Sequence, residues 1–267
     1  MLPPNVGKYT RYHLPGQLEG SMAESLLDLI LQAKHCVALT GAGISTLSGI
    51  PDFRGVGGLY NRTDIDASKL FDINYFLRDP SYYYKHSKDF LYSLDDKSPS
   101  LVHECLAGLE NKGLLKAVIT QNVDLLHQRA GSQVVFELHG SPRRHRCLDC
   151  GEEYGFTEIA RRVNEGEVPF CGLCGGTIKP DIVFFGEMLP SYDLENASRQ
   201  ARQADLMLVL GTSLTVYPAA ALPEETLAGR GKLAIVNAGP THMDKRAIWR
   251  GTDLSAVFAP IQEYLHS

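Results

Sequence analysis

CVALTGAGISTLSGIPDFRG, residues 36–55, joins a short apolar run to a glycine-rich turn. Residues 36–39 have the length and composition of a buried strand, and the first glycines follow directly. A glycine-rich turn after a strand is the usual binding place of a dinucleotide pyrophosphate. The fingerprint G-x-G-x-x-G is incomplete, because Thr46 stands at the third glycine position. The stretch therefore predicts a dinucleotide site and leaves open whether the dinucleotide is recycled or consumed.

Composition and charge are those of an ordinary globular protein. The chain has 267 residues, of which 44% are hydrophobic and 21% charged, and its formal net charge is -5. This charge does not indicate nucleic-acid binding. The first twenty residues contain no apolar signal-peptide core, and the uncharged stretch 206–223 is broken by glycine and proline. We expect a cytoplasmic protein without a membrane partner.

Strand-like and helix-like patterns alternate along most of the chain. Apolar runs of strand length occur at 35–40, 115–120, 134–138, 181–185, 206–210, 233–236 and 256–258. Helical patterns occur at 122–130, 193–204 and 218–229, and Ser21 with Glu24 predicts the capping box of an earlier helix. This alternation predicts an α/β fold, a doubly wound, mainly parallel Rossmann-like sheet.

Two segments interrupt this alternation and predict a smaller lobe. Residues 56–100 are rich in Tyr and Asp without a clear strand, which indicates a cofactor loop and a helical insertion. Residues 144–179 contain the paired cysteines. The predicted organisation is therefore an N-terminal extension (1–20), a sheet domain (21–55, 101–143 and 180–267), the insertion (56–100) and a zinc-ribbon module (144–179).

Two C-x-x-C pairs predict a metal site. Cys147 and Cys150 form the first pair, and Cys171 and Cys174 form the second after a twenty-residue spacer. Four thiolates complete a tetrahedral zinc site and leave no open position for catalysis, so the zinc would be structural. Two redox pairs or an iron cluster are the alternatives. The other two cysteines, Cys36 and Cys105, lie in a strand-like and a helix-like pattern, which indicates core residues.

Small and polar residues follow five of the predicted strands. Because ligands bind beyond the carboxyl ends of strands in a doubly wound sheet, we expect these residues to line one cleft for a polar, extended ligand. Turns favour the same residue types, so no one of the five segments is diagnostic alone. The segments are Gly41, Ala42 and Gly43; Gln121, Asn122, Val123 and Asp124; His139 and Gly140; Gly211, Thr212 and Ser213; and Asn237, Ala238 and Gly239.

The chemistry of the cleft does not match that of an ordinary dehydrogenase. The second strand ends in Gln-Asn, and no acidic residue stands about 20 residues beyond the glycines to bind the adenosine ribose. His139 directly follows a strand, and an imidazole with an ordinary pKa of about 6.5 suits a general base. The sequence contains no G-x-S-x-G elbow, so the nucleophile would come from the ligand itself. His127 is expected only to pack.

Six motifs in order resemble the sirtuins, NAD-dependent protein lysine deacylases, and in particular their prokaryotic-type single-domain members. The motifs extend from about Val37 to Phe258, which is nearly the whole chain. They are GAGISTLSGIPDFRG, TQNVDLLHQRAG, LHGS, the CxxC–x20–CxxC unit, KPDIVFFGE and GTSLTVYPAA.

This resemblance implies a role for each matching residue. The cofactor loop would comprise Ala42, Gly43, Thr46, Phe53 and Arg54, next to Gly41. Gln121 and Asn122 would contact the nicotinamide ribose, while Asp124 and the Val123 amide would hold the carboxamide. Gly211, Thr212, Ser213 and Asn237 would face the adenosine half, with Asp253 near the adenine. Val183, Phe185 and Gly186 would form the edge on which an acetylated-lysine peptide adds as a strand.

The resemblance also implies a reaction that consumes NAD. The acyl-lysine oxygen would attack the ribose and release nicotinamide, and His139 would then deprotonate a ribose hydroxyl that attacks the acyl carbon. Water would complete the reaction, giving free lysine, nicotinamide and O-acyl-ADP-ribose. Relatives that prefer acidic acyl groups carry Tyr-x-x-Arg in the insertion; here Lys85, His86 and Ser87 follow the three tyrosines, so acetyl is expected.

Other activities remain open at this point. A zinc-containing dehydrogenase, an ADP-ribosyltransferase or NAD glycohydrolase, and a non-catalytic zinc-ribbon binding module are the alternatives. We further expect a monomer, with acetylated-lysine proteins or peptides as partners.

Overall fold

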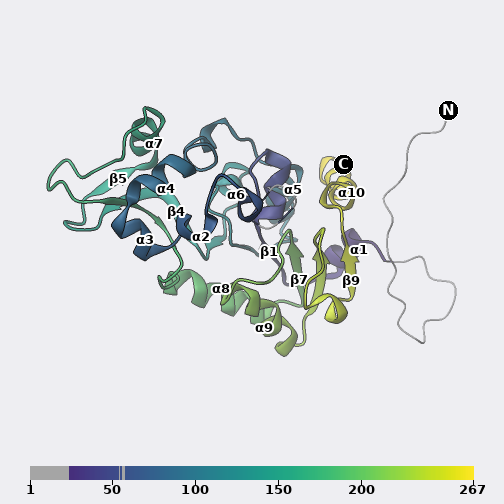
Figure 1. Cartoon of the computed structure of the whole chain (residues 1–267). Helices are drawn as coiled ribbons and strands as arrows, with labels where there is room; N and C mark the ends of the chain where they lie inside the picture. Colours follow the sequence, from purple (N-terminus) through teal and green to yellow (C-terminus); the bar gives the residue numbers. More distant parts are fainter. Residues whose placement is uncertain (1–23, 54, 56–57) are drawn as a thin grey trace.

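The computed structural model describes residues 24–53, 55 and 58–267 (Figure 1). The predicted extension 1–20, the helix start at Ser21, and Arg54 lie outside the described residues. Within the described ranges, no helix is both long and apolar enough to cross a membrane.

A six-stranded parallel sheet forms the centre of the larger domain. Its strand order is β3-β2-β1-β7-β8-β9, so the chain winds outward from β1 in one direction and later from β7 in the other. Strands β1, β2 and β7 are buried throughout, as expected for a parallel sheet covered on both faces. The strands are β1 (Cys36–Thr40), β2 (Ala117–Thr120), β3 (Val135–Glu137), β7 (Leu206–Leu210), β8 (Lys232–Val236) and β9 (Trp249–Gly251).

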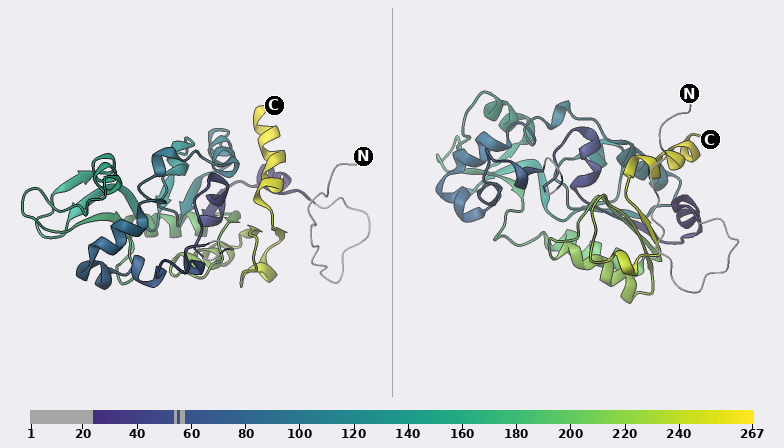
Figure 2. Two further views of the ribbon diagram at one scale, coloured as in Figure 1. Left: turned by 45° about the horizontal axis from the view of Figure 1, so that its top comes forward. Right: turned by 45° about the vertical axis from the view of Figure 1, so that its right-hand side comes forward.

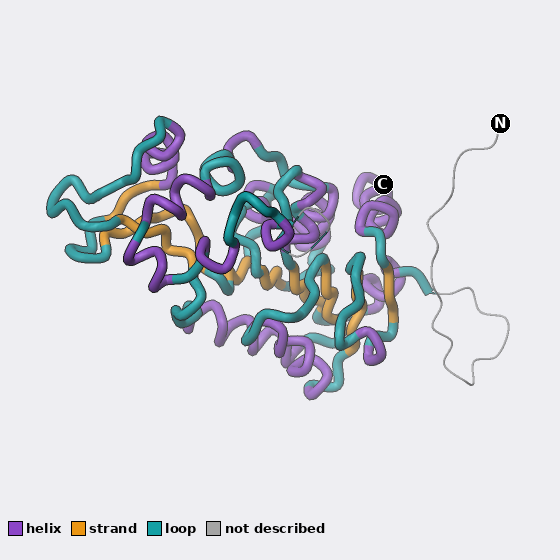
Figure 3. Tube along the Cα trace, viewed as in Figure 1, coloured by secondary structure: helices purple, strands orange, loops and turns teal. Residues whose placement is uncertain are grey.

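Helices cover both faces of this sheet (Figures 1 and 3). Cys36 and Ala38 of β1 belong to the core on the face of α1 (Leu26–Gln32), α5 (Leu101–Asn111) and α10 (Leu254–His266). Val37 and Leu39 point into the opposite core, formed with α8 (Ser191–Gln203) and α9 (Leu222–Ala228). The alternation of side chains along a strand thus supplies both cores from one apolar run.

The smaller lobe lies at one end of the molecule (Figure 2). Its antiparallel sheet has the order β5-β4-β6. One aromatic core joins this sheet to the helical insertion: Phe184 packs against Phe76 and Tyr83, and the Tyr84 hydroxyl donates to the Ile178 carbonyl at 2.7 Å. The elements are α2 (Ala67–Leu70), α3 (Ile73–Arg78), α4 (Pro80–Ser87), β4 (Gly140–Cys147), β5 (Glu153–Gly155), α7 (Phe156–Asn164) and β6 (Ile178–Ile182). A short helix, α6 (Leu126–Arg129), belongs to the larger domain.

Several predictions from the apolar pattern are wrong. The strand expected at 181–185 is β6 (Ile178–Ile182), which pairs with β4 in the small sheet because Ile182 and Phe184 bury their side chains in the aromatic core. Residues 256–258 belong to α10, since the Asp253 carboxylate caps a helix whose apolar face includes Val257, Phe258 and Ile261. The last strand of the sheet is β9 instead.

Two helix boundaries also differ from expectation. Helix α1 begins after Ser25, which forms a capping box with Asp28, rather than at the earlier expected start. The helix expected at 122–130 begins only at Leu126, because polar groups of residues 121–124 bond to neighbouring turns instead.

Candidate NAD and peptide site

Loops from three strands, β1, β2 and β7, meet at the carboxyl edge of the main sheet. The Gln121 side chain donates to the Thr212 hydroxyl at 3.0 Å, and the Asn122 side-chain amide donates to the Gly41 carbonyl at 3.2 Å. The main chain of Gly43 donates to the Gly211 carbonyl at 2.9 Å. The edge thus carries a row of polar groups around the switch point between β1 and β7.

Glycine is required where the loop after β1 touches the loop after β7. A Cβ at Gly43 would lie 2.8 Å from the Gly211 Cα, and a Cβ at Gly41 would lie 2.7 Å from the Thr212 Cβ. Gly211 itself has φ of +61°, a left-handed conformation that favours glycine. The two glycines of GAG therefore let one turn approach the next, whether or not a nucleotide is bound.

Ser45 connects the glycine-rich turn to the Asn122–Asp124 segment, and the sequence analysis missed it. Its hydroxyl donates to the Asp124 carboxylate at 2.6 Å and accepts from the Asn122 amide at 3.1 Å. Asn122 and Asp124 are both buried, 8% and 7% exposed. A serine within a glycine-rich turn gives no signal in one sequence, because turns favour serine for local reasons.

His139 follows β3 with one residue between them, and its ring is held in one tautomer. Its Nδ1 donates to the Gln121 carbonyl at 2.8 Å, so the neutral imidazole carries its lone pair on Nε2. Burial is the main cause that lowers the pKa of His139 below its ordinary value. A neutral ring with a free Nε2 is the form that a general base requires at neutral pH.

The other expected nucleotide contacts lie in their own loops. Thr46 donates to the Gly43 carbonyl at 2.9 Å, and the Phe53 ring lies 5.8 Å from the Phe71 ring. Ser213 bonds to Thr215, and Asn237 donates to the Gly239 carbonyl at 3.0 Å. The Asp253 carboxylate accepts from the Ala256 main chain at 3.1 Å as a helix cap. Ala42 is half-buried in the turn, and the half-buried Val123 packs against the aromatic core.

The segment after β6 offers a free backbone edge at one of the three expected positions. Val183 donates to the His139 carbonyl, and both backbone groups of Phe185 bond to residues 71 and 73 of the insertion. Within the described residues, the N–H and C=O of Gly186 make no main-chain hydrogen bond. An added strand would therefore pair at Gly186, while Val183 and the exposed Phe185 contribute side chains.

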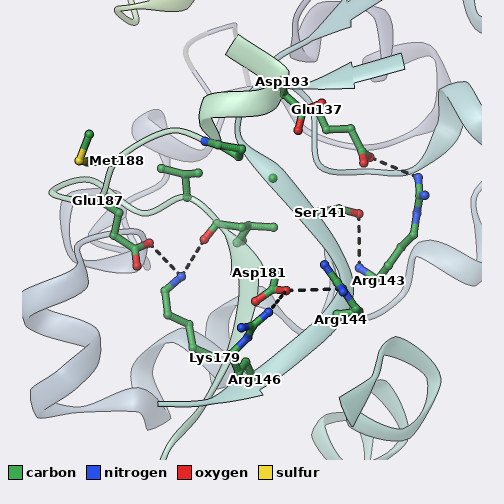
Figure 4. Close-up of a pocket in the computed structure, with 14 residues that line it drawn as sticks. Glu137, Ser141, Arg143, Arg144, Arg146, Lys179, Asp181, Glu187, Met188 and Asp193 are labelled. Carbon is green, nitrogen blue, oxygen red and sulfur yellow. Dashed lines mark hydrogen bonds and ion pairs between the residues drawn. The ribbon is translucent and has the colours of Figure 1, made fainter. Parts of the chain in front are cut away.

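A hollow of about 630 Å³ adjoins this edge (Figure 4). Its charged groups pair within the wall: Lys179 lies 2.9 Å from Glu187, and Arg143 lies 3.3 Å from Glu137. Asp181 contacts two further arginines of β4 more loosely, at 3.7 and 3.5 Å. Burial raises the pKa of Glu137 and lowers the pKa of Lys179.

The four paired cysteines form one cluster in the small lobe. Their Sγ atoms all lie within 4.8 Å of one another. Cys147 and Cys174 are 3.5 Å apart, as are Cys150 and Cys171, distances close to those of neighbouring ligands in a tetrahedral zinc–thiolate site. The Tyr154 hydroxyl donates to Cys171 at 3.1 Å and is the main cause that lowers the pKa of that thiol to about 6. The donor set therefore fits zinc.

A doubly wound sheet with polar groups at its strand ends, together with a four-cysteine cluster, is typical of nucleotide-binding α/β proteins with a zinc lobe. The Sir2 family model matches residues 41–218, and the chain belongs to this family. It is 46% identical over 221 residues to the NAD-dependent protein deacetylase of Thermotoga maritima, covering 83% of this chain and 89% of that protein.

Two solved structures are similar throughout the fold. A structure of Sir2 with p53 peptide and NAD+ has a TM-score of 0.80 and 43% identity, covering 90% of this chain and 95% of the other. A Sir2 complex with an inhibitor, 2'-O-acetyl-ADP-ribose and deacetylated p53 peptide has a TM-score of 0.78 and 42% identity, covering 90% and 96%.

Buried imidazoles make the folded state sensitive to acid. Burial lowers the pKa of His103 to about 4 and that of His145 to about 3, and that of His127 also falls well below its usual range. In the unfolded chain each of these imidazoles takes up a proton at about pH 6.5, whereas in the folded protein it does so only at a lower pH. The free energy of unfolding is therefore highest above about pH 6.5 and falls as the pH decreases below that value. At about pH 5.5, one unit below the pKa of a free imidazole, each histidine that stays neutral in the folded protein reduces the free energy of unfolding by about 1.4 kcal/mol relative to neutral pH.

Urea unfolding at pH 7.5 and pH 5.5 would measure this loss. Repeating both titrations with added zinc controls for metal release from the cysteines. Equal unfolding free energies at the two pH values would contradict the prediction.

Proposed function

We propose that this chain is an NAD-dependent protein lysine deacetylase that consumes NAD and releases nicotinamide and O-acetyl-ADP-ribose. The observation that carries the proposal is the position of His139. The His139 Nδ1 donates to the Gln121 carbonyl, and the His139 carbonyl accepts from the Val183 main chain. His139 therefore lies between the polar strand ends and the expected peptide edge. A base at this junction can act on a ribose on one side and an acyl-lysine on the other.

The residues of the cleft would bind and orient NAD. Gln121 and Asn122 would contact the nicotinamide ribose, and Asp124, held by Ser45, would bind the carboxamide with the Val123 amide. The loops at Gly41–Gly43, Gly211–Ser213 and Asn237 would bind the rest of the dinucleotide. NAD supplies a ribose carbon that becomes electrophilic as neutral nicotinamide leaves. His139 Nε2 would accept the proton of the ribose hydroxyl, after which that oxygen attacks the acyl carbon. Addition of water would then release the free lysine and leave the acetyl group on the ribose.

The acylated peptide would add as a strand at Gly186, with its lysine passing toward His139. Residues flanking the acyl-lysine would run past the hollow of Figure 4. The insertion favours an uncharged acyl group: Tyr83 and Tyr84 are fully buried, and the Tyr82 hydroxyl is already bonded to the Asp66 main chain at 2.7 Å. None of the three hydroxyls is thus available with an arginine to bind an acidic acyl group.

Zinc, bound by Cys147, Cys150, Cys171 and Cys174, would stabilise the small lobe and take no part in the chemistry. Four thiolate ligands leave no coordination position for a substrate. We also propose the domain limits given by the sequence patterns, with residues 56–100 and 144–179 as the insertion and the zinc module. The cytoplasmic location and the monomeric state stay predictions.

The test is a mass-spectrometric assay with NAD and an acetyl-lysine peptide. Equal amounts of nicotinamide, deacetylated peptide and acetyl-ADP-ribose are expected. Nicotinamide without loss of the acetyl group would instead indicate an NAD glycohydrolase or an ADP-ribosyltransferase. If NAD stays intact with acetylated, propionylated and longer acyl peptides, the proposal is wrong and a binding module is favoured.

A further inference from the structure

A buried row of polar side chains lies beneath the cleft, and the proposed chemistry does not use it. Thr40 and Thr120 end β1 and β2 and stand opposite each other in the sheet register. The Thr40 hydroxyl donates to the Thr120 hydroxyl at 2.9 Å, and His127 Nε2 lies 2.9 Å from the Thr40 hydroxyl. All three side chains are at most 3% exposed. Both threonine hydroxyls are hydrogen-bonded, as buried polar groups usually are, whereas His127 Nδ1 has no partner among the described residues.

The row ends at the peptide unit that orients His139. The Asn122 N–H donates to the Thr120 hydroxyl at 3.0 Å, and the Gln121 carbonyl of the same peptide accepts from His139 Nδ1 at 2.8 Å. A peptide unit is planar, so fixing its N–H also fixes the direction of its C=O. A displacement at Thr120 would therefore change the angle at which the Gln121 carbonyl meets the imidazole.

The other end of the row is a pair of imidazoles, His127 and His103, whose rings are in contact. His103 Nδ1 accepts from the Ser100 main chain at 3.2 Å, so its proton is on Nε2. Because the Thr40 proton goes to Thr120, His127 donates from Nε2 and keeps its lone pair on Nδ1. The two rings meet edge to face with centroids 4.7 Å apart. Among the described residues, neither His103 Nε2 nor His127 Nδ1 has a hydrogen-bond partner, so the two rings meet by packing.

We propose that His127 is a positioning residue for the general base, acting through Thr40, Thr120 and the Gln121–Asn122 peptide on the tautomer and orientation of His139. The inference rests on the proposed function, because it assumes that His139 is the base. Buried residues of the sheet interior thus help to set the orientation of the His139 ring.

The first test removes single links while preserving shape. Thr40→Val and His127→Leu are each expected to lower kcat for deacetylation about tenfold, a loss comparable to that of one hydrogen bond, with the KM for the peptide within about twofold of wild type. The acid limb of the pH–rate profile should shift, because the surroundings of His139 change. His127→Gln keeps a donor at the Nε2 position and should restore most of the rate.

His145→Leu is the matched control. His145 is equally buried, and its ring has one hydrogen-bond partner among the described residues, the Tyr92 hydroxyl at 2.9 Å, but it lies in the small lobe. It is expected to cost similar stability without moving the pH profile. If the Thr40 and His127 variants match this control in rate and profile, the positioning role is wrong.

A measurement independent of activity separates this inference from the proposed function. Nitrogen NMR of the His139 ring reports its tautomer and its pKa in the protein without substrates. Wild type should show the proton on Nδ1, and Thr40→Val should show a mixed tautomer or a changed pKa. If the His139 signal is unchanged in both Thr40→Val and His127→Leu, the positioning role is wrong, even when the enzyme is active. An inactive wild type would refute only the proposed function.

Discussion

Replacing His139 by alanine is expected to slow deacetylation by a factor of about 10² to 10⁴, the usual contribution of a positioned general base. The neutral Nε2 is the group that would accept the ribose proton, and within the described residues Nδ1 is already bound to the Gln121 carbonyl. Nicotinamide release should persist more than deacetylation, because it precedes the step that needs the base. Steady-state kinetics of both products would measure the two effects separately.

His35→Ala is the control for this variant. His35 is also half-buried and bonded, through Nε2 to Gln200 at 2.8 Å, but it precedes β1 at the opposite edge of the sheet. Its rate should stay near that of wild type. In wild type, the pKa of His139 is lowered, so the rate should hold at pH 7 and fall only in acid below about pH 6.5. Full deacetylation by His139→Ala would remove the histidine from the mechanism.

Removing the metal should unfold the small lobe and abolish activity with it. The side chains of Cys147 and Cys171 belong to the same core as Tyr83 and Phe184, so the cluster supports both the insertion and the peptide edge. Binding of a structural zinc ion is coupled to folding and contributes several kcal/mol or more. Cys171→Ser or a strong chelator is expected to lower zinc content, expose residues 144–179 to protease and eliminate deacetylation.

Cys105→Ala provides the comparison, since Cys105 is buried in α5 outside the cluster. It should keep one zinc ion per chain. The zinc assignment would fail if Cys171→Ser retained wild-type zinc content and the same protease pattern. Iron in the purified protein would instead favour the cluster alternative.

The local patterns of the sequence determined much of the architecture. The apolar runs around residues 36–40, 117–120, 206–210 and 232–236 are buried parallel strands, and strands of this kind have continuous apolar sequences because both of their faces are covered. The C-x-x-C spacing likewise predicted the cysteine cluster, because two residues between ligands bring both thiols to one turn. Glycine and polar residues after the strands indicated the cleft, since parallel strands end at one edge.

Tertiary structure alone decided which apolar runs join which sheet and which polar groups meet. The run at 181–185 had strand composition, but β6 ends at Ile182, because the aromatic core of the small lobe holds Ile182 and Phe184, and Gly186 beyond it is the free edge. Ser45, Thr40 and His127 carry no pattern in the sequence, because their partners are about 80 residues away or more. Hydrogen bonds over such distances depend on how the strands are ordered. Side-chain periodicity, which reports only whether a position is buried, cannot encode them.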